Sequence, residues 1–239
     1  MAPSESAQDS KNRRRRFTPL ATSWSLDLFV TEFGRYTASN DISIIILLHH
    51  PPRLEQGIVP MQTPSLEEIL AQWKAQEAAI RATLGEPGAL SMAQVSALTP
   101  KEFFEGIARG ELPCPPIGVL LDFVPIEWST GTFTFQGTPD VRHYNPLGAV
   151  HGGYAATLLD SCMGCAIHTC LQKGQGYTTL DLRISYVRGM NEATGPVRAE
   201  GKVVHVGRST ALAEGRIVDA NGRLYATGTT TCMLFGKAD

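Results

Sequence analysis

The chain has 239 residues, 43% of them apolar, which is enough to build the core of one large domain or of a smaller domain with extensions. Its 21 basic and 23 acidic residues leave a formal net charge of -2, which disfavours nucleic acid and anionic membranes as partners. The longest apolar run, residues 42–48, is far shorter than the roughly 20 residues of a membrane-spanning helix. We therefore expect a small molecule or another protein as the partner.

Residues 1–60 are a polar, Ser- and Arg-rich start followed by a stretch without a sustained helical or strand period, and we expect them to be poorly structured. Met61 stands directly before the first well-formed helix signal. One hypothesis is that natural translation begins at Met61 and that the upstream residues are a misassigned extension.

The chain holds five cysteines, an odd number, and three of them crowd into one expected helix. This pattern favours reduced thiols over a disulfide framework. The arginines at 13–16 have no adjoining apolar block of the kind that a signal peptide contains. We expect a cytoplasmic protein.

Residues 61–111 are expected to form a helical extension. Residues 65–68 (Ser-Leu-Glu-Glu) are a capping box, and apolar residues follow at helical spacing until Gly85 ends the helix. Residues 99–102 (Thr-Pro-Lys-Glu) repeat the capping box with Pro100 at the first helical position. This second signal predicts a short helix, which the dense prolines between 113 and 116 end.

From Ile117 onward the pattern changes to strands. The stretches "IGVLLDFVPIEW" and "GTFTFQG" flank a turn signal at residues 129–131, which predicts a hairpin. After one long helix come four stretches that alternate apolar and polar residues, at 177–189, 195–207, 208–219 and 222–235. This order excludes a doubly wound parallel fold and favours an antiparallel sheet curled around one helix.

The expected helix at residues 152–171 is apolar on nearly every side, as is typical of a buried helix. Cys162, Cys165, His168 and Cys170 resemble a string of metal ligands, but Cys170 points away from the others on a helix, so we expect no metal. A carboxylate inside such a helix is costly unless it is paired or performs chemistry. We interpret Asp160 as catalytic, with a structural ion pair to a strand arginine such as Arg183 as the alternative.

The start of the same helix offers a complementary group. Gly152 and Gly153 leave backbone N–H groups open where the helix dipole is positive, and Asn145 and His151 stand just before them, placed to orient a carbonyl and the loop. Gly152 and Asp160 lie about 12 Å apart on one helix, too far to act on the same carbonyl. Two chains whose helices pair antiparallel about a twofold axis would bring Asp160 of one near Gly152 of the other. The spacing therefore predicts an isologous dimer with two composite sites.

The pattern Asn145-x2-Gly148-x2-His151-Gly152-Gly153-x6-Asp160, together with "GYTTLDLRISYVR", "VHVGRST" and "DANGRLYATGTTTC", resembles the hotdog-fold acyl-CoA thioesterases of the PaaI-like (phenylacetic acid degradation) type. The resemblance covers about residues 112–235. It implies an α+β hotdog domain over residues 112–239, with the sheet wrapped around one long central helix. It also implies a homodimer, or a homotetramer built as a dimer of dimers.

The resemblance further implies hydrolysis of an acyl-CoA thioester without a metal or redox cofactor, since coenzyme A is part of the substrate. By family analogy Asp160 is the nucleophile or the general base that activates water, and the Gly152 N–H of the opposing subunit polarises the carbonyl. Asn145 and His151 would assist, and Thr179 would hold the attacking water. Candidate contacts to the phosphates of coenzyme A and to the acyl group are Arg188, Arg208, Gly153, Tyr154 and Leu158.

Two alternatives stay open. A hotdog dehydratase or hydratase of acyl thioesters pairs a catalytic His with an acid differently, and Gly152-Gly153 replaces the Pro-Gly-rich loop expected after its His. A non-catalytic acyl-CoA binding protein has no need of a buried acid at position 160.

Overall fold

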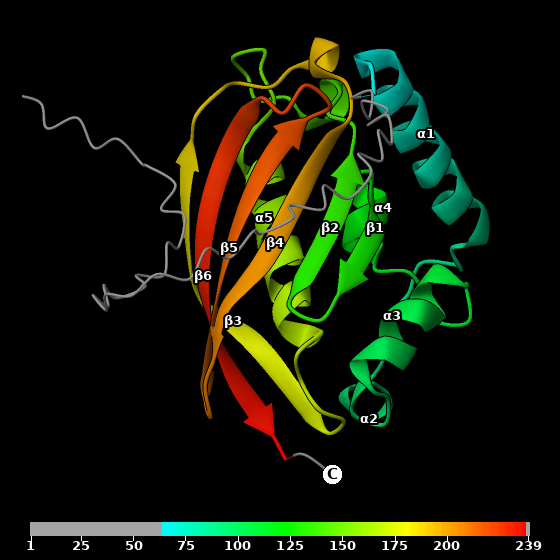
Figure 1. Ribbon diagram of the computed structural model, residues 1–239, viewed down its shortest axis with the longest axis vertical. Helices are drawn as coiled ribbons and strands as arrows, with labels where there is room; N and C mark the ends of the chain where they lie inside the picture. The colour runs from blue at the N-terminus through cyan, green and yellow to red at the C-terminus, as the bar shows by residue number, and fades with distance from the viewer. Residues whose placement is uncertain (1–63, 238–239) are drawn as a thin grey trace, which may run out of the picture. The chain divides into compact units, whose positions relative to one another are not determined.

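Helices occupy the first part of the described chain, residues 64–237 of the computed structural model (Figure 1). α1 (Leu66–Thr83) begins at the capping box of Ser65, whose backbone N–H donates to the Glu68 carboxylate at 2.7 Å. α3 (Pro100–Ala108) begins in the same way at Thr99. Both helices expected from the capping boxes are confirmed, whereas the expectations for residues 1–60 and for a start at Met61 lie outside the described residues.

Two short helices differ from the sequence expectation. α2 (Met92–Ser96) was not expected, although Ser91 and Gln94 form a capping box at its start. α4 (Pro116–Leu120) occupies residues that we predicted to be the start of a strand, and this prediction is wrong. A proline in the first turn has the φ of a helix, so Pro116 starts α4, and the strand begins only at Phe123.

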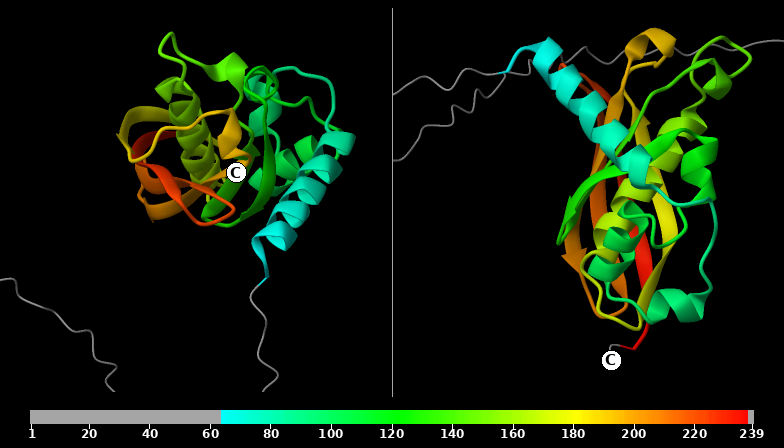
Figure 2. Two further views of the ribbon diagram at one scale, coloured as in Figure 1. Left: turned by 90° about the horizontal axis from the view of Figure 1, so that it is seen from above. Right: turned by 90° about the vertical axis from the view of Figure 1, so that its right-hand side faces the viewer.

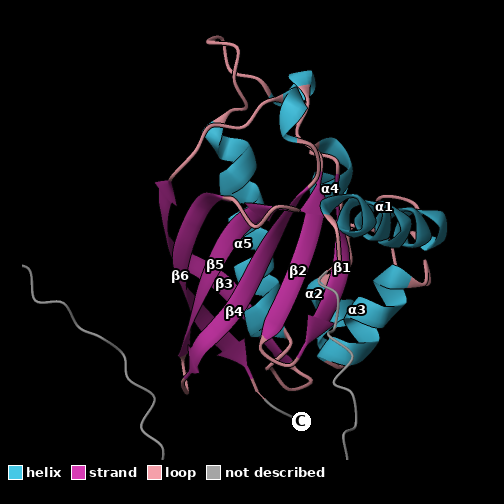
Figure 3. Ribbon diagram, turned by 45° about the horizontal axis from the view of Figure 1, so that its top comes forward, coloured by secondary structure: helices cyan, strands magenta, loops and turns pink. Residues whose placement is uncertain are grey.

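A single antiparallel sheet of six strands follows, and Figure 3 shows the strands side by side with the central helix behind them. The strands are β1 (Phe123–Ser129), β2 (Thr132–Gly137), β3 (Gln175–Tyr186), β4 (Val197–Val206), β5 (Thr210–Asp219) and β6 (Leu224–Gly236). Their order across the sheet is β1-β2-β4-β5-β6-β3, so β1 and β3 are the edges. Short 3-10 turns stand at η1 (Val141–His143) and η2 (Glu192–Thr194). The expected hairpin, the four later strands and the antiparallel sheet are confirmed.

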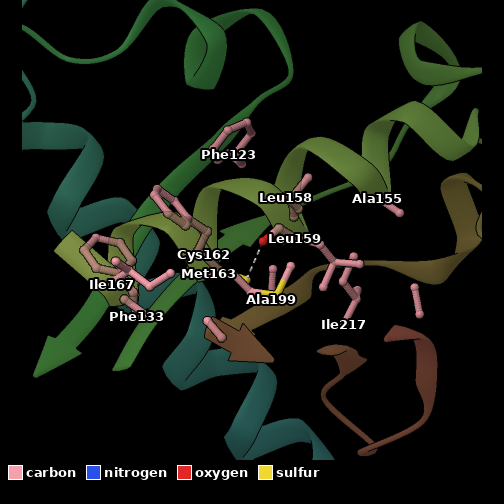
Figure 4. Packing of buried hydrophobic residues seen from close by; sticks show 14 of the residues in the cluster. Phe123, Phe133, Ala155, Leu158, Leu159, Cys162, Met163, Ile167, Ala199 and Ile217 are labelled. Carbon is pink, nitrogen blue, oxygen red and sulfur yellow. Dashed lines mark hydrogen bonds between the residues drawn. The ribbon is translucent and has the colours of Figure 1, made fainter. Parts of the chain in front are cut away.

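α5 (Gly152–His168) is the central helix, and the strands curl around it (Figure 2). Leu158, Leu159, Met163 and Ile167 are fully buried between α5 and the sheet (Figure 4). β4 approaches the helix so closely that a Cβ atom at Gly201 would overlap the carbonyl group of Cys162. The sheet face that holds α5 is therefore the core of the domain.

α1 covers part of the opposite face of the sheet. Successive side chains of a strand point to opposite faces, and Val197 and Ala199 of β4 belong to the core around α5, so Arg198 points the other way. The Arg198 guanidinium lies 4.2 Å from the centre of the Trp73 ring of α1 and donates to Gln136 of β2 at 3.0 Å. Both faces of this corner of the sheet are thus covered.

No helix within residues 64–237 is long and apolar enough to cross a membrane.

Candidate active site

Asp160 lies midway along α5 and faces strand β3. Its Oδ1 accepts a hydrogen bond of 2.9 Å from the Thr179 hydroxyl. Leu158 and Leu159 are fully buried, but Asp160 itself remains partly exposed in the single chain, so the expectation of an acid inside a wholly buried helix is corrected. Asp160 forms no ion pair with Arg183, which instead pairs with Asp181 at 3.4 Å. The structure therefore brings together Asp160 and Thr179, two of the expected site residues.

A β-bulge puts Thr179 on the helix side of its strand. Thr179 pairs with Cys232 and Asp181 with Thr231, which leaves Leu180 as the extra residue. Tyr177 and Leu182 both pack against the core. In a regular strand, side chains five positions apart point to opposite faces, so the bulge must interrupt the alternation between these two residues. The bulge thus lets Thr179 face α5 without turning the rest of β3 away from the core.

The first turn of α5 leaves the backbone N–H of Gly152 open. His151 is the N-cap, and its Nδ1 accepts the Gly153 N–H at 2.9 Å, so this N–H is engaged within the loop itself. The Tyr154 N–H donates to the His151 carbonyl at 3.0 Å. The Gly152 N–H, by contrast, donates to no group of residues 64–237. Of the two glycines that we expected to contact substrate, only Gly152 offers a free donor at the positive end of the helix dipole.

Tyr186 contacts the same glycine and was not expected from the sequence. Its hydroxyl donates to the Gly152 carbonyl at 3.0 Å. A Cβ atom at Gly152 would lie 3.1 Å from the Tyr186 ring and hydroxyl, closer than side chains normally pack. Tyr186 therefore orients the Gly152–Gly153 peptide and leaves little room for a side chain at position 152.

Asn145 shapes the loop before α5. Its side-chain Oδ1 accepts the N–H groups of Leu147 and Ala149, at 2.9 and 3.3 Å. Gly148, within this loop, has a φ of +78°, which favours glycine. The Asn145 amide NH2 group is left without a partner among the described residues, so it can still donate to a ligand.

Tyr154 lies inside the core and not on an open surface. Its side chain is 3% exposed, and its ring packs 4.5 Å from the ring of His143. Burial raises the pKa of the Tyr154 hydroxyl, with the negative charges of Asp122 and Asp140 adding to the effect. The phenol is neutral, and in the single chain it does not reach the surface where a substrate would bind. Leu158 is likewise fully buried.

Arg188 and Arg208 are both exposed but lie at opposite ends of the sheet. Arg188 lies two residues beyond Tyr186, the last residue of β3. Arg208 lies two residues before Thr210, the first residue of β5. Thr210 pairs with Met233, and Met233 pairs with Thr178 near the other end of β3. Eight residues of β3 separate these two levels, which corresponds to about 27 Å. The structure therefore does not bring the two arginines of one chain together.

The cysteines of α5 are protonated at neutral pH. Burial raises the pKa of the Cys165 thiol to about 12 and raises that of Cys162 well above its ordinary value, and the negative charge of Asp160 adds to both shifts. Only a thiolate is a strong nucleophile or metal ligand. Within residues 64–237 no group of three or more His, Cys, Asp or Glu side chains is placed to hold a metal ion.

Comparison with known proteins defines the class. Residues 147–226 match the family model "Thioesterase superfamily", and the expected α+β hotdog fold is confirmed. Within the superfamily the resemblance to the PaaI-like type is also confirmed. A candidate thioesterase of Ralstonia eutropha JMP134, described as a phenylacetic acid degradation-related protein, superposes with a TM-score of 0.50 at 26% identity, over 57% of this chain and 99% of that one.

Two curated relatives add to this comparison. The chain is 41% identical over 73 residues to a candidate esterase of Halobacterium salinarum, across 30% of this chain and 46% of that protein. It is 29% identical over 120 residues to the 1,4-dihydroxy-2-naphthoyl-CoA hydrolase of Escherichia coli K12, across 49% of this chain and 87% of that protein. The chain thus spans about half the length of the Halobacterium salinarum esterase that it matches.

Proposed function

We propose that the chain is an acyl-CoA thioesterase, which hydrolyses the thioester of an acyl- or aryl-acyl-CoA to the free acid and coenzyme A. The observation that carries the proposal is the hydrogen bond between Thr179 and Asp160, which holds a partly exposed carboxylate in one orientation within a thioesterase-superfamily domain. The relative from Escherichia coli is named as a hydrolase of an aromatic acyl-CoA, which supports the substrate class.

In the proposed reaction Asp160 is the general base. The Thr179 hydroxyl donates to Oδ1, so Oδ2 is available to accept a proton from water, and the Thr179 oxygen can accept the second hydrogen of that water. The water oxygen attacks the thioester carbonyl while its proton passes to Asp160. The C–S bond of the tetrahedral intermediate then breaks, and Asp160 returns the proton to the departing thiolate of coenzyme A. The reaction written in this way uses no metal or redox cofactor.

The negative charge on the carbonyl oxygen is stabilised by the Gly152 N–H of a second chain. α5 is continuous from Gly152 to His168, so the Gly152 N–H and Asp160 of one chain stay about 12 Å apart. β3 is an edge strand whose outer backbone groups have no partner strand among residues 64–237, and such an edge can pair with a second copy. Pairing of two β3 strands about a twofold axis gives a homodimer with two composite sites.

The remaining expected residues take supporting roles. The free NH2 group of Asn145 and the His151 loop orient the carbonyl. Arg188 and Arg208 are candidates for the phosphates of coenzyme A, and because they stand at opposite ends of the sheet in one chain, a single phosphate group binds one of them and not both. The five free thiols support a reducing compartment such as the cytoplasm.

The test is release of free thiol from a panel of acyl- and aryl-acyl-CoAs by the wild type, Asp160→Asn and a matched control, Asp181→Asn. Asp181 is an exposed carboxylate on β3 that pairs with Arg183 and not with Thr179. We expect Asp160→Asn to lower kcat by about 10²- to 10⁴-fold, the usual contribution of a general base, and the control to keep its activity. No thiol release by the wild type would refute the thioesterase, and water addition to an enoyl-CoA would then indicate the hydratase.

A single turnover in H2(18)O tests the role of Asp160. A general base delivers solvent oxygen to the product acid, so we expect the label in the acid. A nucleophilic Asp160 would instead form an anhydride with release of the coenzyme A thiolate, and attack of water on the Asp160 carbonyl of that anhydride would leave the label in the Asp160 carboxylate and not in the acid. Unchanged thiol release after dialysis against EDTA is the check on the absence of a metal.

A further inference from the structure

Helix α1 is joined to the active-site loop by a continuous set of polar contacts, although it lies outside the residues that match the superfamily model. The first contact leads from the helix to the segment before β1. Arg81, in the last turn of α1, contacts Asp122 with 2.8 Å between its Nη2 and Oδ1. The other carboxylate oxygen of Asp122 accepts a hydrogen bond from Arg142 at 3.0 Å. Asp122 thus connects two arginines that are 61 positions apart in the sequence.

The backbone of Asp122 is held in an unfavourable conformation. Its φ is +56°, and among the described residues it is the one non-glycine with a positive φ. This region is strained for most side chains, and such strain persists where the surroundings fix the conformation, often at functional sites. The carboxylate is therefore kept at a position where glycine would fit the backbone better.

The contacts continue from Arg142 to the turn η1. The Arg142 Nε donates to Asp140 at 2.8 Å, and the Arg142 N–H donates to the same carboxylate at 2.7 Å. These bonds from Arg142 hold the pKa of Asp140 below its ordinary value. The Asp140 N–H donates to Nδ1 of His143 at 3.1 Å. The ends of η1 are thus fixed to each other and, through Arg142 and Asp122, to α1.

His143 connects this turn to the loop before α5. Its carbonyl accepts the His151 N–H at 2.7 Å, and His151 in turn caps α5 through Gly153. The His143 side chain is buried against Tyr154, and its Nε2 and the Tyr154 hydroxyl have no hydrogen-bond partner within residues 64–237. Burial of two polar groups without hydrogen-bond partners lowers the stability of the fold, so stability alone does not explain this arrangement.

We propose that α1 is a positioning element of the active site: acting through Asp122 and Arg142, it fixes η1 and so the orientation of the Gly152 N–H. This inference rests on the proposed thioesterase function. The ion pairs are too exposed to stabilise the fold much, whereas a small displacement of a group that stabilises charge in the transition state has a large effect on rate. Arg81, Asp122 and Arg142 touch no substrate and act only through the loop.

The kinetic test compares Arg81→Ala and Asp122→Asn with the matched control Arg109→Ala. Arg109 is likewise an exposed arginine with two acidic partners, Glu105 and Glu111, but neither partner leads to the loop. We expect each test variant to lower kcat about three- to tenfold with KM within about twofold, and the double variant to be no slower than the slower single variant. The control keeps the wild-type kcat. Wild-type kcat in both test variants overturns the inference.

A second measurement does not depend on activity. Amide hydrogen exchange of the full chain reports on the His151 and Gly153 N–H groups, whose bonds close the connection. We expect Arg81→Ala to speed their exchange about fivefold and Arg109→Ala to leave it unchanged. If the wild type hydrolyses no thioester, the proposed function fails and the exchange data still decide whether α1 fixes the loop. Unchanged exchange in Arg81→Ala overturns the inference even in an active enzyme.

Discussion

The stability of the domain is expected to fall steeply in mild acid because of His168, the last residue of α5. Its ring lies 5.1 to 5.7 Å from the rings of Phe103, Phe104 and Tyr177, and its side chain is largely buried. Burial lowers the pKa of His168 from its ordinary value of 6.5 to about 4. At pH 7.5 the ring is therefore largely uncharged in both the folded and the unfolded chain.

The sign of the effect follows from which state binds the proton. Between pH 6.5 and about 4 the unfolded chain binds a proton at His168 and the folded chain does not, so the unfolded state gains stability as the pH falls. The folded state has its full stability above pH 6.5. The difference between the two pKa values corresponds to a loss of about 3 kcal/mol once the pH has fallen through the folded value.

The assay is urea unfolding of the wild type and of His168→Leu at pH 7.5 and pH 4.5, at one protein concentration. Other groups titrate in both proteins, so the informative quantity is the difference between their losses. We expect the free energy of unfolding of the wild type to fall by about 2 to 3 kcal/mol more than that of the variant. Equal losses in the two proteins would refute the reasoning, because His168 would then not carry the pH dependence.

Two further predictions concern glycines that other residues approach. Gly201→Ala should lower the free energy of unfolding by about 3 kcal/mol, because the new Cβ overlaps the Cys162 carbonyl group, whereas Gly189→Ala, with open space around it, should change it by less than about 0.5 kcal/mol. Urea unfolding compares the two, and similar values would contradict the close approach of β4. Tyr186→Phe removes the bond to the Gly152 carbonyl and should lower kcat about fivefold with less than about 1 kcal/mol lost in stability. Steady-state kinetics measures this, and an unchanged kcat would mean that Gly152 is oriented without Tyr186.

The sequence predicted those parts of the fold that local patterns determine. The capping boxes at Ser65 and Thr99 mark the starts of α1 and α3, because cap and partner stand three residues apart in the chain itself. The strands after α5 were predicted from the alternation of apolar and polar residues, because this pattern indicates a strand with one face buried. α4 was misread because a short apolar run such as residues 117–121 has no period that separates helix from strand.

The site was predicted in part for the same reason. Asp160 and Gly152 could be chosen as candidates because an acid in an apolar helix and glycines at a helix N-terminus are both visible in the sequence, and a helix fixes the distance between them. Tyr186 and Asp122 were missed, since each acts on residues at least 20 positions away and nothing in its own surroundings marks it. The bulge at Leu180, which turns Thr179 toward Asp160, depends on strand register, and register is decided by the partner strand.

The length of α5 has a consequence for inheritance as well as for chemistry. In a dimer whose sites each combine Gly152 of one chain with Asp160 of the other, a chain that lacks the acid and a chain that lacks the glycine N–H are each inactive alone. When the two are expressed together and pair at random, half of the dimers are mixed, and each mixed dimer keeps one site with both groups intact, about a quarter of the normal number of sites. Two defective alleles of this gene would then complement each other within one cell.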